Sequence, residues 1–111
     1  MKHVSRETWG AQPPPKGKFD KLNRSRVQGV VVHHSGVQNG PKGSAAVKAF
    51  ERHHMGKGWD GVGYNWLVDE TGTIFEGRGW DNRGAGTKGW NSRSISVCFT
   101  GWGGDKPSDN A

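Results

Sequence analysis

Val30-Val31-Val32-His33-His34-Ser35 is the stretch of sequence that decides the fold of this chain. Three β-branched apolar residues in a row predict a buried strand. Two histidines and a small polar residue follow, where the strand should open into a loop. Because histidine is the commonest metal ligand and titrates close to neutral pH, this strand end indicates a catalytic or metal-binding site. A metal site needs several ligands, so further ligands are required elsewhere in the chain.

The composition is that of one loop-rich domain. The chain has 111 residues, of which 31% are hydrophobic, with 19 glycines and six tryptophans. This balance favours an α/β or α+β domain with aromatic anchors over a helical bundle. The net charge of +6 suits nucleic acid, an anionic membrane or an anionic cell wall. No helix-turn-helix, zinc-knuckle or RNA-binding aromatic motif is present, so nucleic acid is not an expected partner.

The remaining composition signals concern cysteine and targeting. The single cysteine, Cys98, excludes an intrachain disulfide framework, and its apolar neighbours predict a buried, inert thiol. The first residues lack the apolar core of a signal peptide. No apolar run approaches the roughly 20 residues of a spanning helix, so we expect no membrane insertion. We therefore expect synthesis in the cytoplasm without a signal peptide.

The pattern along the chain predicts four strands and one helix. We expect an extended N-terminal arm over residues 1–26 pinned by Trp9, a domain over 27–102 and a flexible tail over 103–111. Within the domain we expect strands at 27–34, 64–68, 73–76 and 94–100, a helix at 45–55 capped by Ser44, and a hairpin turn at Asp69–Gly72. With so few elements, one face of the sheet is left without an evident cover.

Histidine and tyrosine are the candidate chemical groups. His33 and His34 are neighbours on a strand, so they point to opposite faces and cannot readily bind one metal together. Tyr64 follows Gly63, and its hydroxyl beside a metal-bound water could donate to a developing oxyanion. A hydrogen-bonded structural role remains the alternative for each of these residues. Glu76 is either a general base or an ion-pair partner of Arg78, and its flanking glycines favour the structural role.

An ordered set of motifs carries a family resemblance. They are Val32-His33-His34-Ser35, Phe50-Glu51-Arg52-His53-His54-Met55, Gly58-Trp59-Asp60-Gly61-Val62-Gly63-Tyr64-Asn65-Trp66-Leu67-Val68, Gly72-Thr73-Ile74-Phe75-Glu76-Gly77-Arg78-Gly79-Trp80 and Asn91-Ser92-Arg93-Ser94-Ile95-Ser96-Val97. Together they resemble the peptidoglycan recognition protein and type 2 N-acetylmuramoyl-L-alanine amidase family, which includes bacteriophage endolysins. Ser5-Arg6-Glu7-Thr8-Trp9-Gly10-Ala11 resembles the family's usual first segment. The resemblance covers nearly the whole chain.

The resemblance implies a fold, a cofactor and a substrate. It implies a mixed central β-sheet with flanking helices, and zinc at the floor of a cleft that binds peptidoglycan. Family members hydrolyse the amide between N-acetylmuramic acid and L-alanine. His33 matches the first zinc ligand, and Tyr64 matches the tyrosine that assists the zinc-bound water. Positions near those that line the cleft in relatives are His34, His54, Trp59, Thr87 and Asn91.

Two departures from the family pattern bear on activity. Gly84-Ala85-Gly86 stands where relatives commonly carry histidine as the third residue. The family's second and third zinc ligands come from a later segment, and we expect this chain to lack that C-terminal part of the fold. One protein ligand cannot hold catalytic zinc, which normally needs three. The zinc site is therefore expected to be incomplete.

Three hypotheses follow for the function. The first is an amidase-family domain acting at the bacterial cell wall, which hydrolyses peptidoglycan only if its zinc site is complete. The second is a non-catalytic module that binds peptidoglycan or a protein partner. The third is an assembly in which a second copy or another chain completes the fold. The basic charge suits all three, so it does not discriminate among them.

Overall fold

A five-stranded mixed sheet forms the centre of the computed structural model, which describes residues 2–35 and 41–100. The strand order is β1-β4-β3-β5-β2. The strands are β1 (His3–Val4), β2 (Gly29–His34), β3 (Trp66–Val68), β4 (Ile74–Glu76) and β5 (Ser94–Phe99); the helices are α1 (Arg6–Trp9) and α2 (Gly43–Gly56), and a 3-10 turn spans Arg24–Arg26. The predicted α/β class, with a mixed sheet and flanking helices, is confirmed.

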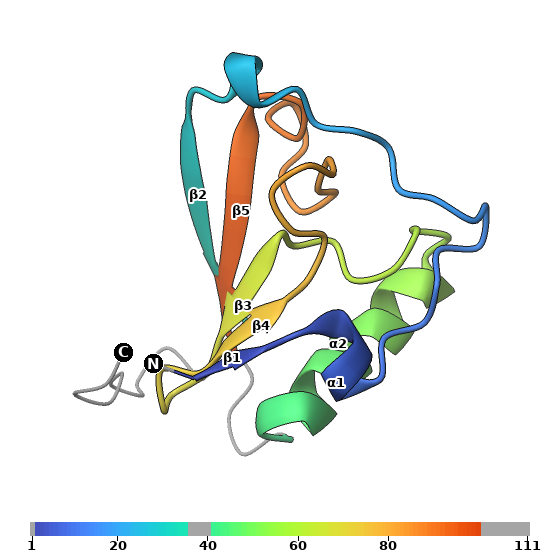
Figure 1. Cartoon of the computed structure of the whole chain (residues 1–111), viewed down its shortest axis with the longest axis vertical. Coiled ribbons are helices and arrows are strands. Elements are labelled where there is room, and N and C mark those ends of the chain that lie inside the picture. The colour runs from blue at the N-terminus through green and yellow to red at the C-terminus, as the bar shows by residue number, and fades with distance from the viewer. Residues whose placement is uncertain (1, 36–40, 101–111) are drawn as a thin grey trace.

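Strand β5 lies between β2 and β3 and is parallel to both. Cys98 of β5 is paired with His33 on one side and with Leu67 on the other. Parallel strands need a crossover connection, and α2 provides it between β2 and β3. Figure 1 shows α1 and α2 on the same side of the sheet. The buried core forms on that side, where Val47 of α2 meets Leu67, Phe75 and Cys98 of the sheet.

Strands β3 and β4 form the predicted hairpin. They pair antiparallel, with Leu67 opposite Phe75. The Asp69 carboxylate accepts hydrogen bonds from the backbone N–H groups of Thr71 (2.9 Å) and Thr73 (3.0 Å). Gly72 has φ +82°, a conformation that favours glycine. The turn chemistry of the sequence thus fixes the register of the hairpin.

Helix α2 follows the predicted apolar face but not the predicted cap. Ala46, Val47 and His54 are buried, as their spacing predicts, and Phe50 packs against the core. The helix begins at Gly43, so Ser44 lies inside its first turn and the prediction that Ser44 caps the helix is wrong. The N-cap residue is Lys42, and its side chain makes no capping hydrogen bond. The helix therefore depends on burial of one face, which is the usual source of helical stability in proteins.

The N-terminal residues contain more structure than the predicted extended arm. Strand β1 pairs parallel with β4, and α1 follows it, so the expectation of an extended segment throughout residues 1–26 is wrong. Ser5 caps α1, because its side chain accepts from the Thr8 N–H, and Gly10 ends the helix at φ +81°. Trp9 is 2% exposed and donates from Nε1 to the Glu76 carbonyl at 2.8 Å. The prediction that Trp9 pins this segment is confirmed.

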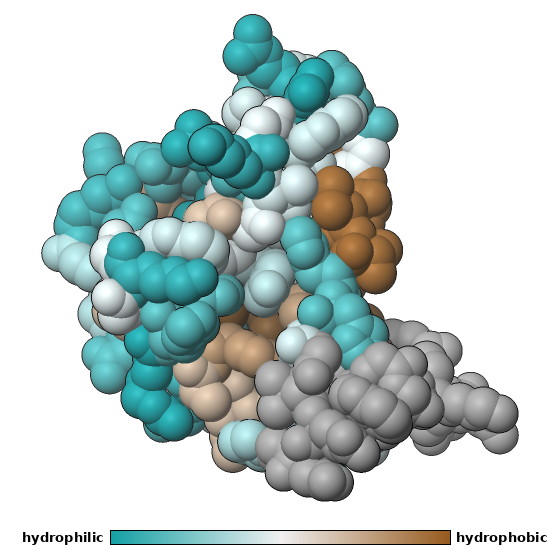
Figure 2. Space-filling model, turned by 180° about the vertical axis from the view of Figure 1, so that it is seen from behind, coloured by the Kyte–Doolittle hydropathy of each residue, from teal (hydrophilic) through white to brown (hydrophobic). Residues whose placement is uncertain are grey.

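Strand β2 is an edge strand, and one of its faces is uncovered. Val30 is 62% exposed and Val32 is 74% exposed, so the prediction of a buried strand is wrong for this face. No helix among the described residues lies on the side opposite α1 and α2 (Figure 1). Figure 2 shows apolar surface gathered there. The sequence predicted that one face of the sheet lacks a cover, and that face is the one that carries Val30 and Val32.

Several expectations concern segments whose structure is not described. Residues 36–40, in the loop expected after the strand at 27–34, lie outside the described residues, as do the predicted domain end at residue 102 and the predicted flexible tail at 103–111. Among residues 2–35 and 41–100, no helix combines the length and the apolar character needed to cross a membrane.

Candidate functional site

His33, Tyr64 and Thr87 come together at the carboxyl end of β2, and we call them the His33 cluster. His33 Nε2 lies 2.6 Å from Thr87 Oγ1, a hydrogen-bond distance at which either atom can donate. The ring centroids of His33 and Tyr64 are 5.2 Å apart. Because parallel pairing places β2 beside β5 and the crossover brings β3 to the other side of β5, three distant segments meet here. Their functional side chains therefore share one place at the end of the sheet.

His33 and His34 lie on opposite faces of β2, as predicted. His34 is exposed, and its ring packs against Phe99 with centroids 5.2 Å apart. Its neighbour His33 faces Tyr64 and Thr87. The structure therefore places His34 on the opposite face from the His33 cluster, although the family resemblance had placed it near the cleft.

Tyr64 is held by backbone hydrogen bonds from two loops. Its carbonyl accepts from the Arg78 N–H at 2.9 Å, and the carbonyl of Gly63 accepts from the Ala85 N–H at 2.8 Å. Gly86 leaves room for the ring, since a Cβ there would lie 3.0 Å from Tyr64 Cε1. Burial, with a smaller contribution from Cys98, raises the pKa of Tyr64 to about 12. The hydroxyl is therefore protonated at neutral pH and is available as a donor.

Cys98 is a structural residue beneath this site. Its side chain is 0% exposed, and burial raises the pKa of the thiol to about 11. A thiol that stays protonated is a poor nucleophile. The prediction of a buried, inert cysteine is confirmed.

His54 supports the wall of the site from α2. Its Nδ1 accepts a hydrogen bond from the Gly63 N–H at 2.8 Å, and its ring lies 4.5 Å from that of Trp59 and 5.5 Å from that of Tyr64. Burial lowers the pKa of His54 to about 4, with further lowering by nearby cationic groups. His54 is therefore neutral at pH 7, with Nδ1 free of a proton. In this state it positions the loop that carries Tyr64.

Asn91 and Trp59 lie beside the His33 cluster rather than inside it. The Asn91 side-chain oxygen accepts from the Thr87 N–H at 2.9 Å and thereby orients Thr87. Both Asn91 and Trp59 line a polar hollow of about 220 Å³, which also contains Arg78. Of the other six residues singled out from the sequence, Tyr64 and Thr87 contact His33 directly. Three more are linked to it through these two: His54 contacts Tyr64, Trp59 contacts His54, and Asn91 contacts Thr87.

Arg78 is a site residue that the sequence did not single out by itself. It is 5% exposed, and it donates from Nε to the Val62 carbonyl at 2.9 Å and from Nη1 to the Arg83 carbonyl at 2.8 Å. The predicted ion pair between Glu76 and Arg78 is not formed, because Glu76 accepts instead from the Arg6 N–H at 3.0 Å. Sequence periodicity does not reveal a buried guanidinium that donates to backbone carbonyls of distant residues.

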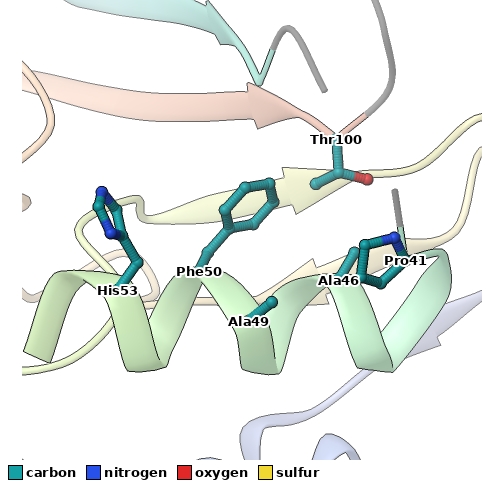
Figure 3. Close-up of a pocket in the computed structure, with 6 residues that line it drawn as sticks. All are labelled: Pro41, Ala46, Ala49, Phe50, His53 and Thr100. Carbon is teal, nitrogen blue, oxygen red and sulfur yellow. The ribbon is translucent and has the colours of Figure 1, made fainter. Parts of the chain in front are cut away.

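An apolar groove lies along α2. It has a volume of about 270 Å³ and is lined by Pro41, Ala46, Ala49, Phe50, His53 and Thr100. Phe50 and His53 project from α2 toward the strand end that carries Thr100 (Figure 3). The His53 ring lies 5.8 Å from that of His54. The polar hollow thus reaches the His33 cluster through Asn91, whereas the apolar groove along α2 is linked to it through the ring contacts of His53 with His54 and of His54 with Tyr64.

The described residues do not form a zinc site by themselves. Within residues 2–35 and 41–100, no three His, Cys, Asp or Glu side chains converge as metal ligands. His33 Nε2 is engaged by a hydroxyl, and the thiol of Cys98 stays protonated. Catalytic zinc normally takes three protein ligands. The donor set present here does not fit that requirement.

The sequence matches the family described as N-acetylmuramoyl-L-alanine amidase over residues 23–111. This match includes every residue of the His33 cluster. The chain belongs to the N-acetylmuramoyl-L-alanine amidase family. Within this family it is similar to peptidoglycan-recognition protein SC1a/b of Drosophila simulans, with 30% identity over 102 residues, covering 88% of this chain and 54% of that protein. It is also similar to peptidoglycan recognition protein 4 of Mus musculus, with 36% identity over 101 residues, covering 88% of this chain and 26% of that protein.

Solved structures share the fold of this amidase-family chain. PGRP-Hd from Alvinella pompejana has a TM-score of 0.84 and 31% identity, covering 99% of this chain and 71% of that one. A chain from the complex of tracheal cytotoxin with the ectodomains of PGRP-LCa and PGRP-LCx has a TM-score of 0.85 and 35% identity, covering 99% of this chain and 68% of that one. The amidase-family chain spans about half the length of relatives such as protein SC1a/b.

Proposed function

We propose that this chain binds the muramyl stem peptide of bacterial peptidoglycan around the His33 cluster. The carrying observation is the convergence of His33, Tyr64 and Thr87, with a polar hollow reached through Asn91 and an apolar groove along the neighbouring helix α2. A stem peptide presents amide groups, carboxylates and alkyl side chains. The polar hollow suits the first two kinds of group, and the apolar groove suits the third.

Two structural relatives support this choice of ligand. One is the complex of tracheal cytotoxin with the PGRP-LCa and PGRP-LCx ectodomains. Another is PGRP-LE in complex with tracheal cytotoxin, described as monomeric diaminopimelic acid-type peptidoglycan, at 32% identity and a TM-score of 0.80. We extend this class of ligand to the present chain and place its action at the bacterial cell wall.

The binding test compares two neighbouring histidines. We expect the chain to sediment with insoluble peptidoglycan, and we expect His33→Gln to weaken binding about tenfold through loss of the imidazole ring that contacts Tyr64 and Thr87. His34→Gln changes the same residue type on the opposite face and should leave binding unchanged. Equal loss in both variants, or no binding by the wild-type chain, would contradict the proposal.

Amidase activity is the second candidate function. Family membership favours it, as does the contact between His33 and the protonated Tyr64. Bound zinc would supply an activated water and polarise the scissile carbonyl. Because the described donor set does not fit zinc, we propose that this chain binds peptidoglycan without cleaving it.

The test for this second candidate measures zinc and product separately. We expect far less than one zinc per chain after gel filtration, and no stem peptide released from purified peptidoglycan with or without added zinc. Stoichiometric zinc together with released stem peptide would establish the amidase instead. Since sedimentation measures binding alone, its result stands whichever way the cleavage assay turns out.

A further inference from the structure

A second polar hollow lies at the end of the sheet opposite the His33 cluster. It has a volume of about 300 Å³ and is lined by Ser25, Arg26, Gln28, Ser92 and Arg93. These residues immediately precede β2 and β5, whereas His33 lies near the other end of β2. Figure 1 shows the turn before β2 and the loop before β5 side by side at that end. The two hollows are therefore separate sites.

Local contacts hold the backbone turn that carries Arg26 and the side chain of Arg93 in place. The 3-10 turn that carries Arg26 is capped by Asn23, whose Oδ1 accepts from the Ser25 N–H at 3.1 Å and from Ser25 Oγ at 2.7 Å. The guanidinium carbon of Arg93 lies 3.9 Å from the ring centroid of Trp90. A backbone hydrogen bond of 2.8 Å from Gln28 N–H to the Arg93 carbonyl joins the two segments. Such pre-positioning lowers the entropy cost of binding a ligand.

The charge of this hollow is positive and locally uncompensated. No carboxylate lines it. Among residues 2–35 and 41–100, the ion pairs involve Lys16, Arg24 and Arg83, and none of them includes Arg26 or Arg93. Two arginines therefore line the same hollow, and neither forms an ion pair with an acidic side chain among the described residues. The hydroxyls of Ser25 and Ser92 add further donors.

We propose that this hollow binds a phosphodiester group of an anionic cell-wall polymer. Guanidinium groups match the oxygens of phosphate with paired hydrogen bonds, and phosphate offers acceptors to two arginines and neighbouring hydroxyls together. Binding of an anion follows from the hollow alone. The choice of a wall polymer rests on the proposed function, since it assumes that the chain acts at the wall.

The experiment titrates the chain with a short poly(glycerol phosphate) and follows backbone amide shifts by NMR. We expect shifts at Ser25, Arg26, Gln28, Ser92 and Arg93. Arg26→Gln combined with Arg93→Gln should weaken binding at least about tenfold. Lys48→Gln combined with Arg52→Gln removes the same charge from exposed positions on α2 and should weaken it less than about twofold. Equal losses in the two double variants would show nonspecific attraction and would overturn the site.

Single substitutions separate charge from geometry. Arg26→Gln alone leaves the contact between Arg93 and Trp90 intact, so it should weaken binding without disturbing the neighbouring loop. Arg93→Lys keeps the charge but removes the planar pair of donors, and it should also weaken binding. Full binding by Arg93→Lys, or by Arg26→Gln, would contradict a two-arginine phosphate site.

Two further arms identify the source of the phosphate. The first arm repeats the titration with a single-stranded oligonucleotide of equal charge. Tighter binding of the oligonucleotide through the same two arginines would overturn the assignment to a wall polymer. Muropeptide binding should survive in Arg26→Gln. If the wild-type chain binds poly(glycerol phosphate) but no muropeptide, the proposed function fails while the anion site stands; the reverse result overturns only the anion site.

Discussion

Asn65 is fully buried, and its side-chain amide joins three segments around the site. Nδ2 donates to the carbonyls of Gly79 at 2.8 Å and Asn82 at 2.7 Å, while Oδ1 accepts from Ser96 N–H at 2.9 Å. A second contact, from Ser96 Oγ at 3.0 Å, fills the remaining acceptor position. Because Asn65 directly follows Tyr64, this network of hydrogen bonds also fixes the position of the Tyr64 backbone.

Gly77 is required by the same close packing. A Cβ at this position would overlap the Tyr64 carbonyl oxygen, although the backbone of Gly77 is not in the left-handed region. We expect Gly77→Ala to lower the free energy of unfolding by about 3 kcal/mol, measured by urea titration. Gly29→Ala is the matched control, since nothing lies within 4 Å of a Cβ there, and it should change stability by about 0.5 kcal/mol at most. Equal effects would contradict a steric origin.

His54 makes stability depend on pH. Its pKa is about 4 when folded and near 6.5 when unfolded, so between these values the unfolded chain binds more protons. Stability contributed by neutral His54 is therefore complete above pH 6.5 and is lost as pH falls toward 4. We expect the free energy of unfolding to fall by about 2 kcal/mol more in the wild type than in His54→Asn over this range.

Asparagine is the informative replacement because it keeps an acceptor for the Gly63 N–H but does not titrate. Carboxylates titrate in both proteins, so the difference between the two unfolding curves isolates His54. His53→Asn removes the exposed neighbour whose charge adds to the lowering of the His54 pKa; because burial is the larger cause, this variant should retain most of the wild-type pH dependence. Parallel curves for wild type and His54→Asn would show that burial of neutral His54 contributes nothing.

At the level of elements, the N-terminal segment, β1 and α1, holds the edge of the sheet at β4 in place. Strand β1 extends the sheet beyond β4, and α1 then turns the chain back onto the core. Arg6 Nη1 donates to the Gly77 carbonyl at 2.9 Å, and Trp9 Nε1 donates to the Glu76 carbonyl at 2.8 Å. These contacts hold the last residue of β4 and the residue that follows it, so this segment supports the backbone near Tyr64.

Trp9 anchors this N-terminal segment to the core, and its removal tests how much the segment contributes to stability. Because its ring is buried and its N–H is hydrogen-bonded, we expect Trp9→Ala to lower the free energy of unfolding by about 4 kcal/mol. Trp80→Ala removes a ring that is 53% exposed and should cost less than about 1 kcal/mol. Thermal unfolding by circular dichroism measures both. A small effect at Trp9 would mean that the segment is dispensable.

At the level of the whole molecule, the described fold has two layers, helices and sheet, and an uncovered side. Parallel strands are usually covered on both faces, yet Val30 and Val32 of β2 are exposed. An apolar hollow of about 290 Å³ lies on the same side and includes Trp66, Trp80 and Val97. An edge strand with exposed valines and no charged side chain favours association with other chains.

The exposed valines predict concentration-dependent self-association. In sedimentation velocity we expect the wild-type chain to gain mass as its concentration rises. Val30→Lys combined with Val32→Lys should reduce this gain, because charge on an edge strand opposes pairing. Gln12→Lys combined with Ala45→Lys adds the same charge on the helix side and should not reduce it. A wild-type chain that stays monomeric throughout would contradict the prediction.

Local sequence signals were sufficient for most elements. The β2 segment, the apolar face of α2 and the hairpin turn at Asp69–Gly72 follow from side-chain periodicity and turn chemistry. Opposite faces for His33 and His34 follow from strand geometry. Their boundaries moved by one or two residues, and Ser44 failed as a cap, because burial of α2 outweighed local capping preference.

The sequence by itself determined the family, the mixed α/β class and the identity of the chemical groups, since all three depend on short ordered motifs. Only the tertiary structure decided how those groups are used. It joined His33 to Thr87 and assigned His54 to the backbone of Gly63. It also left Val30 and Val32 exposed. Contacts between distant segments and the cover of a sheet face arise from strand order, which no local pattern encodes.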